Sequence, residues 1–124
     1  MPILGIGVDI VSVERIKSIW YRYKKRFEKK VFTPKEIHYA FKKKFPFYTL
    51  SGYFAIKEAY YKAIGGYSGF SFQDIEILHH KNGAPFLNLK NKAFVVNKEK
   101  GVKKVWISIS HEKEYAIGIV VLEG

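Results

Sequence analysis

The sequence predicts an α+β fold in which a mostly antiparallel sheet packs against helices. One strand-like segment comes first, three helix-like segments follow, and the second half alternates short strand-like segments with turns and one helix. Hydrophobic residues make up 48% of the chain and aromatic residues 17%, which is enough for a sizeable core in 124 residues. Because no internal repeat, low-complexity tract or linker interrupts the chain, residues 1–124 are expected to form a single domain.

The first strand is expected over residues 3–11, where Asp9 is the only charged residue in an apolar run. Ser12 is a candidate N-cap for a helix that follows at once, and Glu14 lies in the first turn, where the helix dipole favours negative charge. The apolar residues of this helix recur at helical spacing: Val13, Ile16, Trp20, Tyr23 and Phe27.

Two more helices are expected before the sequence turns to strands. The stretch Thr33-Pro34-Lys35-Glu36 has the composition of a capping box with proline at the first helical position, and this helix is expected to end near Pro46. A third helix is expected to begin at Thr49 or Ser51 and to end at Gly65-Gly66, because glycine readily adopts the left-handed conformation that closes helices.

The period of the pattern changes to two from Phe72 onward. Ile75 and Ile77 alternate with Asp74 and Glu76, which predicts a half-buried strand with the two acids facing solvent. The remaining elements are a turn at Asn82-Gly83, a strand over 86–89, a helix over 91–100 closed by Gly101, and strands over 105–110 and 115–122 around the turn "HEKE".

The net charge of +11 favours polyanionic partners, namely nucleic acid, an acidic protein or a phosphate-rich small molecule. The run "KKRFEKK" and nearby aromatic residues keep a small basic nucleic-acid-binding domain as the alternative function. That alternative leaves Asp9 and Glu58 without a role, and the basic residues are not interleaved with aromatic ones in a recognised motif.

Several classes of protein are disfavoured. No apolar run approaches the roughly 18 residues that cross a bilayer, so no membrane partner is expected. The absence of cysteine excludes disulfide and thiolate chemistry, and together with a start unlike a signal peptide it favours the cytoplasm. The sequence has no GxSxG elbow and no GxxxxGK loop, which argues against hydrolase triads and P-loop enzymes.

Asp9 at the end of a strand and Glu58 in the middle of a helix are the candidate metal ligands. If the strand and the helix pack together, the two carboxylates can converge on one hard divalent cation, with water and phosphate oxygens as its other ligands. Two ordinary roles remain open: Glu58 can form an ion pair with Lys62 one turn onward, and Asp9 can help Ser12 to cap the first helix.

Among the histidines, His111 alone lies where a strong strand meets a polar turn. A structural or merely exposed role for it remains open. His38, His79 and His80 are expected at the surface, without the spacing of metal ligands.

Five segments together resemble the holo-acyl-carrier-protein synthases, a family of 4'-phosphopantetheinyl transferases. They are "GIGVDIVSVERI" at 5–16, "FAIKEAYYKAIG" at 54–65, "FQDIEI" at 72–77, "NGAP" at 82–85 and "ISISHEKEYA" at 107–116. The resemblance implies the transferase fold and the movement of 4'-phosphopantetheine from coenzyme A to a serine of apo-acyl carrier protein, which leaves adenosine 3',5'-bisphosphate.

The resemblance also implies roles for particular residues. Asp9 and Glu58 match the ligands of Mg²⁺, and Lys62 matches a lysine near the diphosphate, so these three are the expected catalytic residues. Coenzyme A is expected to contact Lys62, Gly65, Ser110 and His111. The group that removes the serine proton stays open between Asp9, Glu58 and a water held by the carboxylates, and the water is the expectation.

The chain departs from the family pattern where coenzyme A would be anchored. Tyr53 stands where arginine is frequent, Gly65-Gly66-Tyr67 replaces a Gly-Thr-Gly turn, and Ala84 stands where lysine is frequent. How the 3'-phosphate and adenine are held is therefore open, and the candidate replacements are Lys42, Lys43, Lys44 and Lys81.

The resemblance further implies docking of the acidic carrier protein on the first helix and a homotrimer with active sites between subunits. The expected carrier contacts are Arg15, Arg22, Lys25 and Arg26, although a solvated charged face is the ordinary role of any one of them. Tyr60 and Tyr61 are expected to be exposed aromatics that a trimer would cover. The short chain resembles the type that serves fatty acid biosynthesis, while the range of carriers and the choice of magnesium or manganese stay open.

Overall fold

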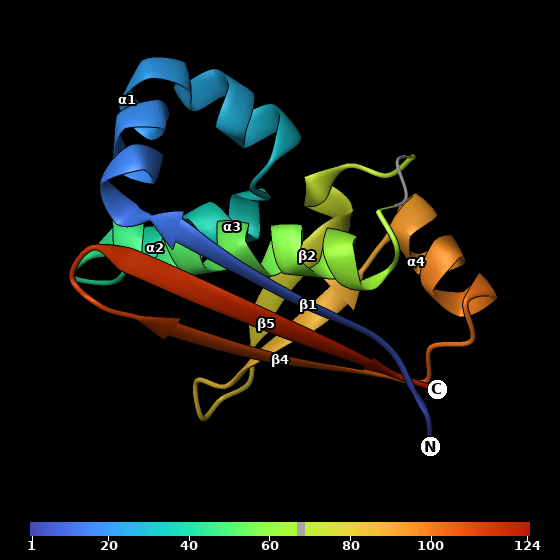
Figure 1. Cartoon of the computed structure of the whole chain (residues 1–124). Coiled ribbons are helices and arrows are strands. Elements are labelled where there is room, and N and C mark those ends of the chain that lie inside the picture. Colours follow the sequence, from blue (N-terminus) through green and yellow to red (C-terminus); the bar gives the residue numbers. More distant parts are fainter. Residues whose placement is uncertain (67–68) are drawn as a thin grey trace.

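The computed structural model describes residues 1–66 and 69–124, so Tyr67 of the altered glycine turn lies outside the described residues. Figure 1 shows the arrangement, with the two ends of the chain close together. In chain order the elements are β1 (Ile3–Ser12), α1 (Val13–Lys30), α2 (Pro34–Phe41), α3 (Pro46–Ala63), the 3-10 turn η1 (Phe72–Asp74), β2 (Ile75–His79), β3 (Pro85–Leu89), α4 (Asn91–Glu99), β4 (Lys104–His111) and β5 (Tyr115–Glu123).

The α+β prediction is confirmed, with two antiparallel sheets in place of one. Strands β1, β5 and β4 form a three-stranded sheet in that order, and β2 pairs with β3 in a separate hairpin. Helix α3 lies along one face of the three-stranded sheet, and the long strands cross in front of it in Figure 1. The first and last strands of the chain are therefore neighbours, and both contact the same helix.

Helix α1 begins as predicted and bends before its end. The Ser12 hydroxyl accepts a hydrogen bond from the backbone N–H of Arg15 at 3.2 Å, which confirms the cap. Tyr23 has φ −132° and ψ 42°, outside the helical region, and 47% of its surface is exposed. Its predicted place in the buried stripe is wrong, because the bend turns this position to solvent while Trp20 and Phe27 stay buried.

The boundary between α2 and α3 differs from the prediction. Helix α2 has the full capping box, in which Thr33 and Glu36 each accept a bond from the other's backbone N–H, but it ends at Phe41 instead of near Pro46. Helix α3 begins at Pro46 instead of at Thr49 or Ser51. Proline fits the first turn of a helix because the N–H that it lacks would have no helical partner there.

Small residues bring α3 unusually close to the three-stranded sheet. Ala55, Ala59 and Ala63 repeat every fourth residue along the buried side of α3. A Cβ added at Gly7 would collide with the carbonyl oxygen of Ala59, and one added at Gly118 would lie 2.7 Å from the backbone nitrogen of Ile56. Glycine is therefore required where these strands cross the helix, because any larger residue would push the two apart.

Buried polar groups hold the opposite side of α3. The Lys57 ammonium, 0% exposed, lies 2.9 Å from Glu36 Oε2 and donates to the carbonyl oxygens of Phe72 and Ile75. Burial raises the pKa of Glu36 and lowers the pKa of Lys57, while the charge of each partner opposes the other's shift. The ion pair joins α2, α3 and the start of β2.

Glu76 is buried, which contradicts its predicted exposure. Only 3% of the residue is exposed, because α2 covers this part of the hairpin with its N-terminal end. The Thr33 hydroxyl donates to Glu76 Oε2 at 2.6 Å and Asn88 donates to Oε1 at 3.1 Å. These hydrogen bonds satisfy the buried Glu76 carboxylate, which the alternating pattern of the strand predicted to face solvent.

Tyr60 is also buried, so the expectation that it is an exposed aromatic is wrong. It is 0% exposed, and its hydroxyl donates to Asn97 Oδ1 of α4 at 2.8 Å. Tyr61 is partly exposed, and its ring centroid lies 6.5 Å from that of Phe70.

The second face of the three-stranded sheet carries exposed apolar side chains. The register places Ile10 beside Ile117 and Val8 beside Ile119, and Ile6 follows on the same face. All of them are exposed. Among the described residues no helix combines the length and the apolarity that crossing a membrane requires.

The buried ion pair predicts a large loss of stability for Lys57→Met. The variant leaves Glu36 buried without its cation and removes the donor from two buried carbonyls, so the free energy of unfolding should fall by roughly 3 to 5 kcal/mol. Urea denaturation measures this. Lys24→Met is the matched control, because Lys24 forms an exposed pair with Glu28 at 3.7 Å and should lose less than about 1 kcal/mol. Equal losses in the two variants would contradict the structural role of Lys57.

Candidate functional site

A cavity of about 400 Å³ lies where the end of β1, the start of α1 and the middle of α3 meet. Asp9 enters it from β1, Arg15 from α1, and Glu58 and Lys62 from α3. Apolar residues complete the wall, notably Ile19 and Phe54. The structure thus brings together both predicted metal ligands, the predicted lysine and the first predicted carrier contact.

Asp9 faces α3 because residues alternate along β1. Its neighbour across the sheet is Gly118, which lies against the backbone of α3. The Asp9 side chain is 19% exposed, so it is partly withdrawn from water at the rim of the cavity. The apolar strand β1 therefore places the Asp9 carboxylate beside α3, at a point where the cavity leaves room for a ligand.

Lys62 forms its ion pair with Asp9. Its Nζ lies 3.0 Å from Asp9 Oδ1 and donates to the carbonyl oxygen of Val8 at 3.1 Å. Among the described residues, Lys62 therefore pairs with Asp9 of β1 and not with Glu58 of its own helix. The second ordinary role also fails, since Ser12 supplies the cap of α1 while Asp9 pairs with Lys62.

Glu58 is electrostatically coupled to the other charges of the cavity. Burial raises the pKa of the Glu58 carboxyl, the negative charge of Asp9 raises it further, and the positive charge of Lys62 opposes both. Two carboxylates that repel each other across one cavity have oxygen atoms of the kind that a hard divalent cation prefers. No group of three or more His, Cys, Asp or Glu side chains that could hold a metal ion occurs within residues 1–66 and 69–124.

Gly65 does not line this cavity. It follows the end of α3 with φ 99°, and Gly66 with φ 73° continues the left-handed turn. An added Cβ at Gly65 would meet no atom of residues 1–66 and 69–124 within 4 Å. The predicted end of α3 at this pair of glycines is confirmed to within two residues.

The other two predicted contacts of coenzyme A lie elsewhere. His111 lines a separate cavity of about 300 Å³, together with Tyr39, Lys43 and Tyr53. Its ring stacks on Tyr48 with centroids 5.0 Å apart. Ser110 pairs with Ile117 in the register and is exposed on the opposite face of the sheet. The structure therefore does not bring His111 and Ser110 together with Asp9 within one chain.

His79 is partly buried in this second cavity, which corrects its expected place at the surface. Its Nδ1 lies 2.9 Å from the carbonyl oxygen of Gly83, which can only accept, and its Nε2 lies 2.6 Å from the Tyr53 hydroxyl. Burial raises the pKa of Tyr53, so this hydroxyl stays protonated and neutral where it hydrogen-bonds with His79. The ring also stacks on Tyr39 at 3.9 Å, which fixes an aromatic wall around the position where the family pattern has arginine.

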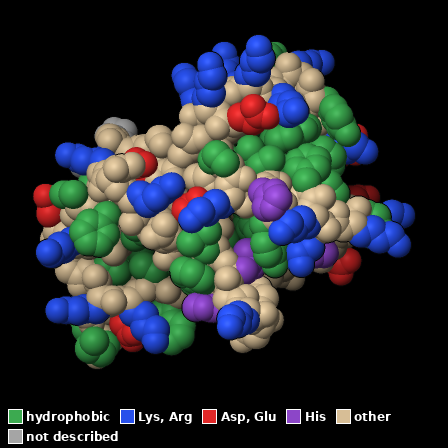
Figure 2. Space-filling view, turned by 180° about the vertical axis from the view of Figure 1, so that it is seen from behind, with side chains coloured by type: hydrophobic (Ala, Val, Ile, Leu, Met, Phe, Trp, Pro, Cys, Tyr) green, Lys and Arg blue, Asp and Glu red, His purple; other side chains and the backbone are tan. Residues whose placement is uncertain are grey.

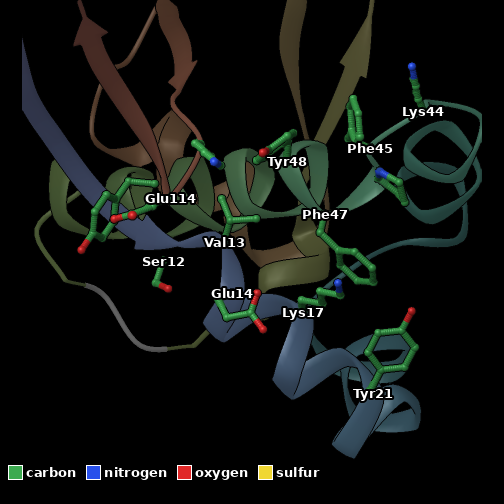
Figure 3. Close-up of a pocket in the computed structure, with 13 residues that line it drawn as sticks. Ser12, Val13, Glu14, Lys17, Tyr21, Lys44, Phe45, Phe47, Tyr48 and Glu114 are labelled. Atoms are coloured by element: carbon green, nitrogen blue, oxygen red, sulfur yellow. The ribbon is translucent and has the colours of Figure 1, made fainter.

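A third cavity, of about 580 Å³, lies on the other side of the junction of β1 and α1. Figure 3 shows Glu14, Lys17 and Tyr21 entering it from α1, opposite Phe47 and Tyr48 of α3. Ser12 lines both this cavity and the one that holds Asp9. Of the residues that the sequence analysis singled out for binding, Lys44, a candidate anchor of the 3'-phosphate, lines this cavity, whereas the predicted metal ligands and carrier contacts do not.

The predicted carrier contacts lie on the exposed part of α1. Arg15, Arg22, Lys25 and Arg26 are all exposed, and the Arg26 guanidinium lies 5.6 Å from the centre of the Tyr23 ring. Figure 2 shows lysine and arginine side chains gathered at the top of the molecule, the end formed by α1.

Sequence reasoning did not assign Phe54, Ile19 or the Tyr53–His79 pair to a cavity. The spacing of Ala55, Ala59 and Ala63 was the available signal for a helix in close contact with glycine-containing strands. No comparable signal exists for His79, since its partners come from α2, α3 and the turn after β2.

Comparisons with known proteins identify the family. Residues 5–120 match the model of the 4'-phosphopantetheinyl transferase superfamily. The chain is 43% identical over 122 residues to a holo-[acyl-carrier-protein] synthase of Halothermothrix orenii, covering 98% of both chains. The crystal structure of holo-[acyl-carrier-protein] synthase from Neisseria meningitidis superposes with a TM-score of 0.87 at 32% identity, covering 99% of this chain and 100% of that one.

A second solved structure adds a ligand. The holo-[acyl-carrier-protein] synthase of Helicobacter pylori in complex with coenzyme A has a TM-score of 0.82 at 34% identity, covering 95% of this chain and 99% of that one. The agreement extends over sequence and fold along almost the whole length. The chain belongs to the 4'-phosphopantetheinyl transferase superfamily.

Proposed function

We propose that this chain transfers 4'-phosphopantetheine from coenzyme A to a serine of apo-acyl carrier protein in support of fatty acid biosynthesis. The main support for this proposal is that Asp9, Glu58 and Lys62 line one cavity in a chain that belongs to this superfamily. The related synthase of Helicobacter pylori, solved with coenzyme A, supports the choice of donor. We further propose that the enzyme works in the cytoplasm.

The residues of the cavity fit a magnesium ion. Asp9 and Glu58 would hold it, because both offer carboxylate oxygens to one space and their mutual repulsion falls when a cation lies between them. Magnesium is commonly bound by one or two carboxylates while water and phosphate oxygens complete its coordination. When bound, the ion supplies positive charge to the diphosphate and polarises the phosphorus that is attacked.

In the proposed reaction the carrier serine oxygen forms a bond to the phosphorus next to the pantetheine. The bond from that phosphorus to the bridging oxygen breaks, and adenosine 3',5'-bisphosphate leaves with that oxygen. Lys62 would stabilise the charge that develops on the leaving phosphate, since its side chain lines the cavity and is half exposed, which leaves its ammonium group accessible to the substrate. The serine proton would pass to a water positioned by Asp9 and Glu58.

The nucleotide end of coenzyme A would contact Gly65, Ser110 and His111 in addition to Lys62. Since His111 lines a cavity apart from that of Asp9, we propose that neighbouring copies in a homotrimer supply the two halves of each active site. The exposed apolar face around Val8, Ile10 and Ile119 supports such an assembly, because a contiguous apolar face is unfavourable in water.

The anchoring of the 3'-phosphate would fall to Lys43 among the candidate lysines. Lys43 lines the cavity of His111, and its ammonium lies 4.8 Å from the centre of the Tyr39 ring. Tyr53 occupies the position of the expected arginine, but its phenol is neutral and hydrogen-bonds with His79, so it supplies no positive charge.

The acidic carrier would dock on α1 through Arg15, Arg22, Lys25 and Arg26. These side chains are exposed, and Arg15 also lines the cavity of Asp9. A carrier bound there would bring its serine beside the metal ligands, and the opposite charges of the two proteins would accelerate their encounter.

The transfer itself is tested by incubating the protein with coenzyme A, Mg²⁺ and an apo-acyl carrier protein. Intact mass spectrometry should show the carrier heavier by one phosphopantetheine group, and a carrier variant with alanine in place of the acceptor serine should stay unmodified. No adduct on a carrier that a known transferase modifies would refute the proposal.

Loss of either carboxylate should abolish metal-dependent turnover. Asp9→Ala and Glu58→Gln are expected to lower kcat/KM by about a hundredfold or more. Removing a group that only orients a metal ligand already costs about ten- to a hundredfold, and the loss of a ligand itself should cost at least as much. Rates measured over a range of Mg²⁺ concentrations test this, with Glu99→Gln on the exposed side of α4 as the control. Normal turnover by either variant, with circular dichroism unchanged, would remove that residue from the metal site.

Reversal of charge at Arg15 should act on the carrier. In Arg15→Glu the KM for the carrier should rise roughly tenfold or more, because like charges then face each other across the interface. Lys103→Glu is the matched control, since it makes the same change of charge on an exposed residue of the loop before β4. An unchanged KM for the carrier in Arg15→Glu would contradict docking on α1.

A further inference from the structure

Lys62 is held at the carboxylate that the proposed metal ion would use. Its ammonium lies 3.0 Å from Asp9 Oδ1, and the carbonyl oxygen of Val8 accepts a second hydrogen bond from it at 3.1 Å. Two oxygen atoms of β1 thus direct the positive charge to the end of the strand. A cation already neutralises Asp9 when no metal is bound.

This contact can be broken at low cost. The Lys62 side chain is 53% exposed, in contrast to Lys57, which is 0% exposed and fixed by its buried partners. A half-exposed ion pair contributes little to stability, and the flexible stem of lysine allows its ammonium to move while its backbone stays in the helix. A divalent cation, with twice the charge, competes well for the same oxygen.

Glu58 is placed differently from Asp9 with respect to Lys62. Both carboxylates line the cavity, but the described ion pair of Lys62 is with Asp9. Among the described residues, an arriving divalent cation therefore meets no paired ammonium at Glu58, whereas at Asp9 Oδ1 it competes with the ammonium of Lys62. The two proposed ligands are unequal before any metal binds.

We propose that Lys62 is an internal counter-cation that occupies Asp9 in the metal-free chain and is displaced when a divalent cation binds. This inference rests on the proposed function, because it takes Asp9 and Glu58 as the metal ligands. Displacement frees the ammonium group to contact phosphate oxygens of the substrate. The same lysine therefore offsets part of the repulsion between the carboxylates before metal binding and contacts the substrate afterward.

Direct binding of Mn²⁺ to the protein without coenzyme A tests the competition. Electron paramagnetic resonance measures free Mn²⁺ and hence the Kd without any need for turnover. Lys62→Met should bind Mn²⁺ about three- to fivefold more tightly than the unchanged chain, since the ion no longer displaces a paired ammonium. Lys62→Arg keeps a cation at Asp9 and should stay within about twofold of the original Kd.

Arg15→Gln separates the contact from the general effect of charge. It removes one positive charge from the same cavity but leaves the ion pair between Asp9 and Lys62 in place. A change of less than about twofold in its Kd supports the proposal, since screening weakens charges that are not in contact. Circular dichroism confirms that each variant remains folded.

The proposal is overturned if Lys62→Met binds Mn²⁺ no more tightly than the unchanged chain, or if Arg15→Gln gains as much affinity as Lys62→Met. Undetectable Mn²⁺ binding by Lys62→Met would overturn it as well. The mass shift of the carrier tests the transfer independently. If the unchanged chain modifies the carrier but Lys62→Met shows no gain in affinity for Mn²⁺, the proposed function stands and only the role of Lys62 as a counter-cation is refuted.

Discussion

The close approach of α3 to the three-stranded sheet is the constraint on which the site depends. Gly5, Gly7 and Gly118 lie where a Cβ would strike the backbone of α3, and the facing side of the helix is made of alanines. A helix held at this distance carries Glu58 and Lys62 to the end of β1, where Asp9 lies. Larger residues at these crossings would widen the gap and separate the charges that form the cavity.

The other side of α3 is fixed by polar contacts instead of small side chains. Lys57 reaches Glu36 of α2 and the backbone before β2, while Tyr60 reaches Asn97 of α4. Buried groups of this kind have few alternative partners, so they determine how the helix is rotated as well as how it is packed. Consecutive residues Lys57 and Glu58 consequently face different surroundings, one in the core and one in the cavity.

The charges of the cavity follow from this placement. A carboxylate taken out of water is unfavourable unless it is paired, and Asp9 has Lys62 as its partner while Glu58 carries a raised pKa. Ile19 and Phe54 form an apolar wall beside these charges, while Lys62 stays half exposed, so its pair with Asp9 remains open to competition from another cation. A site that is partly neutralised by its own lysine keeps its two carboxylates side by side without leaving Asp9 unpaired.

Local signals determined much of the secondary structure and the list of candidate residues. The cap at Ser12, the capping box at Thr33 and the turn at Asn82-Gly83 each depend on a few consecutive residues, so the sequence alone predicted them. Family motifs also indicated Asp9, Glu58 and Lys62. Only the tertiary structure decided that Lys62 pairs with Asp9, that Glu76 is buried and that His111 lies in another cavity, because contacts between segments distant in sequence set those positions.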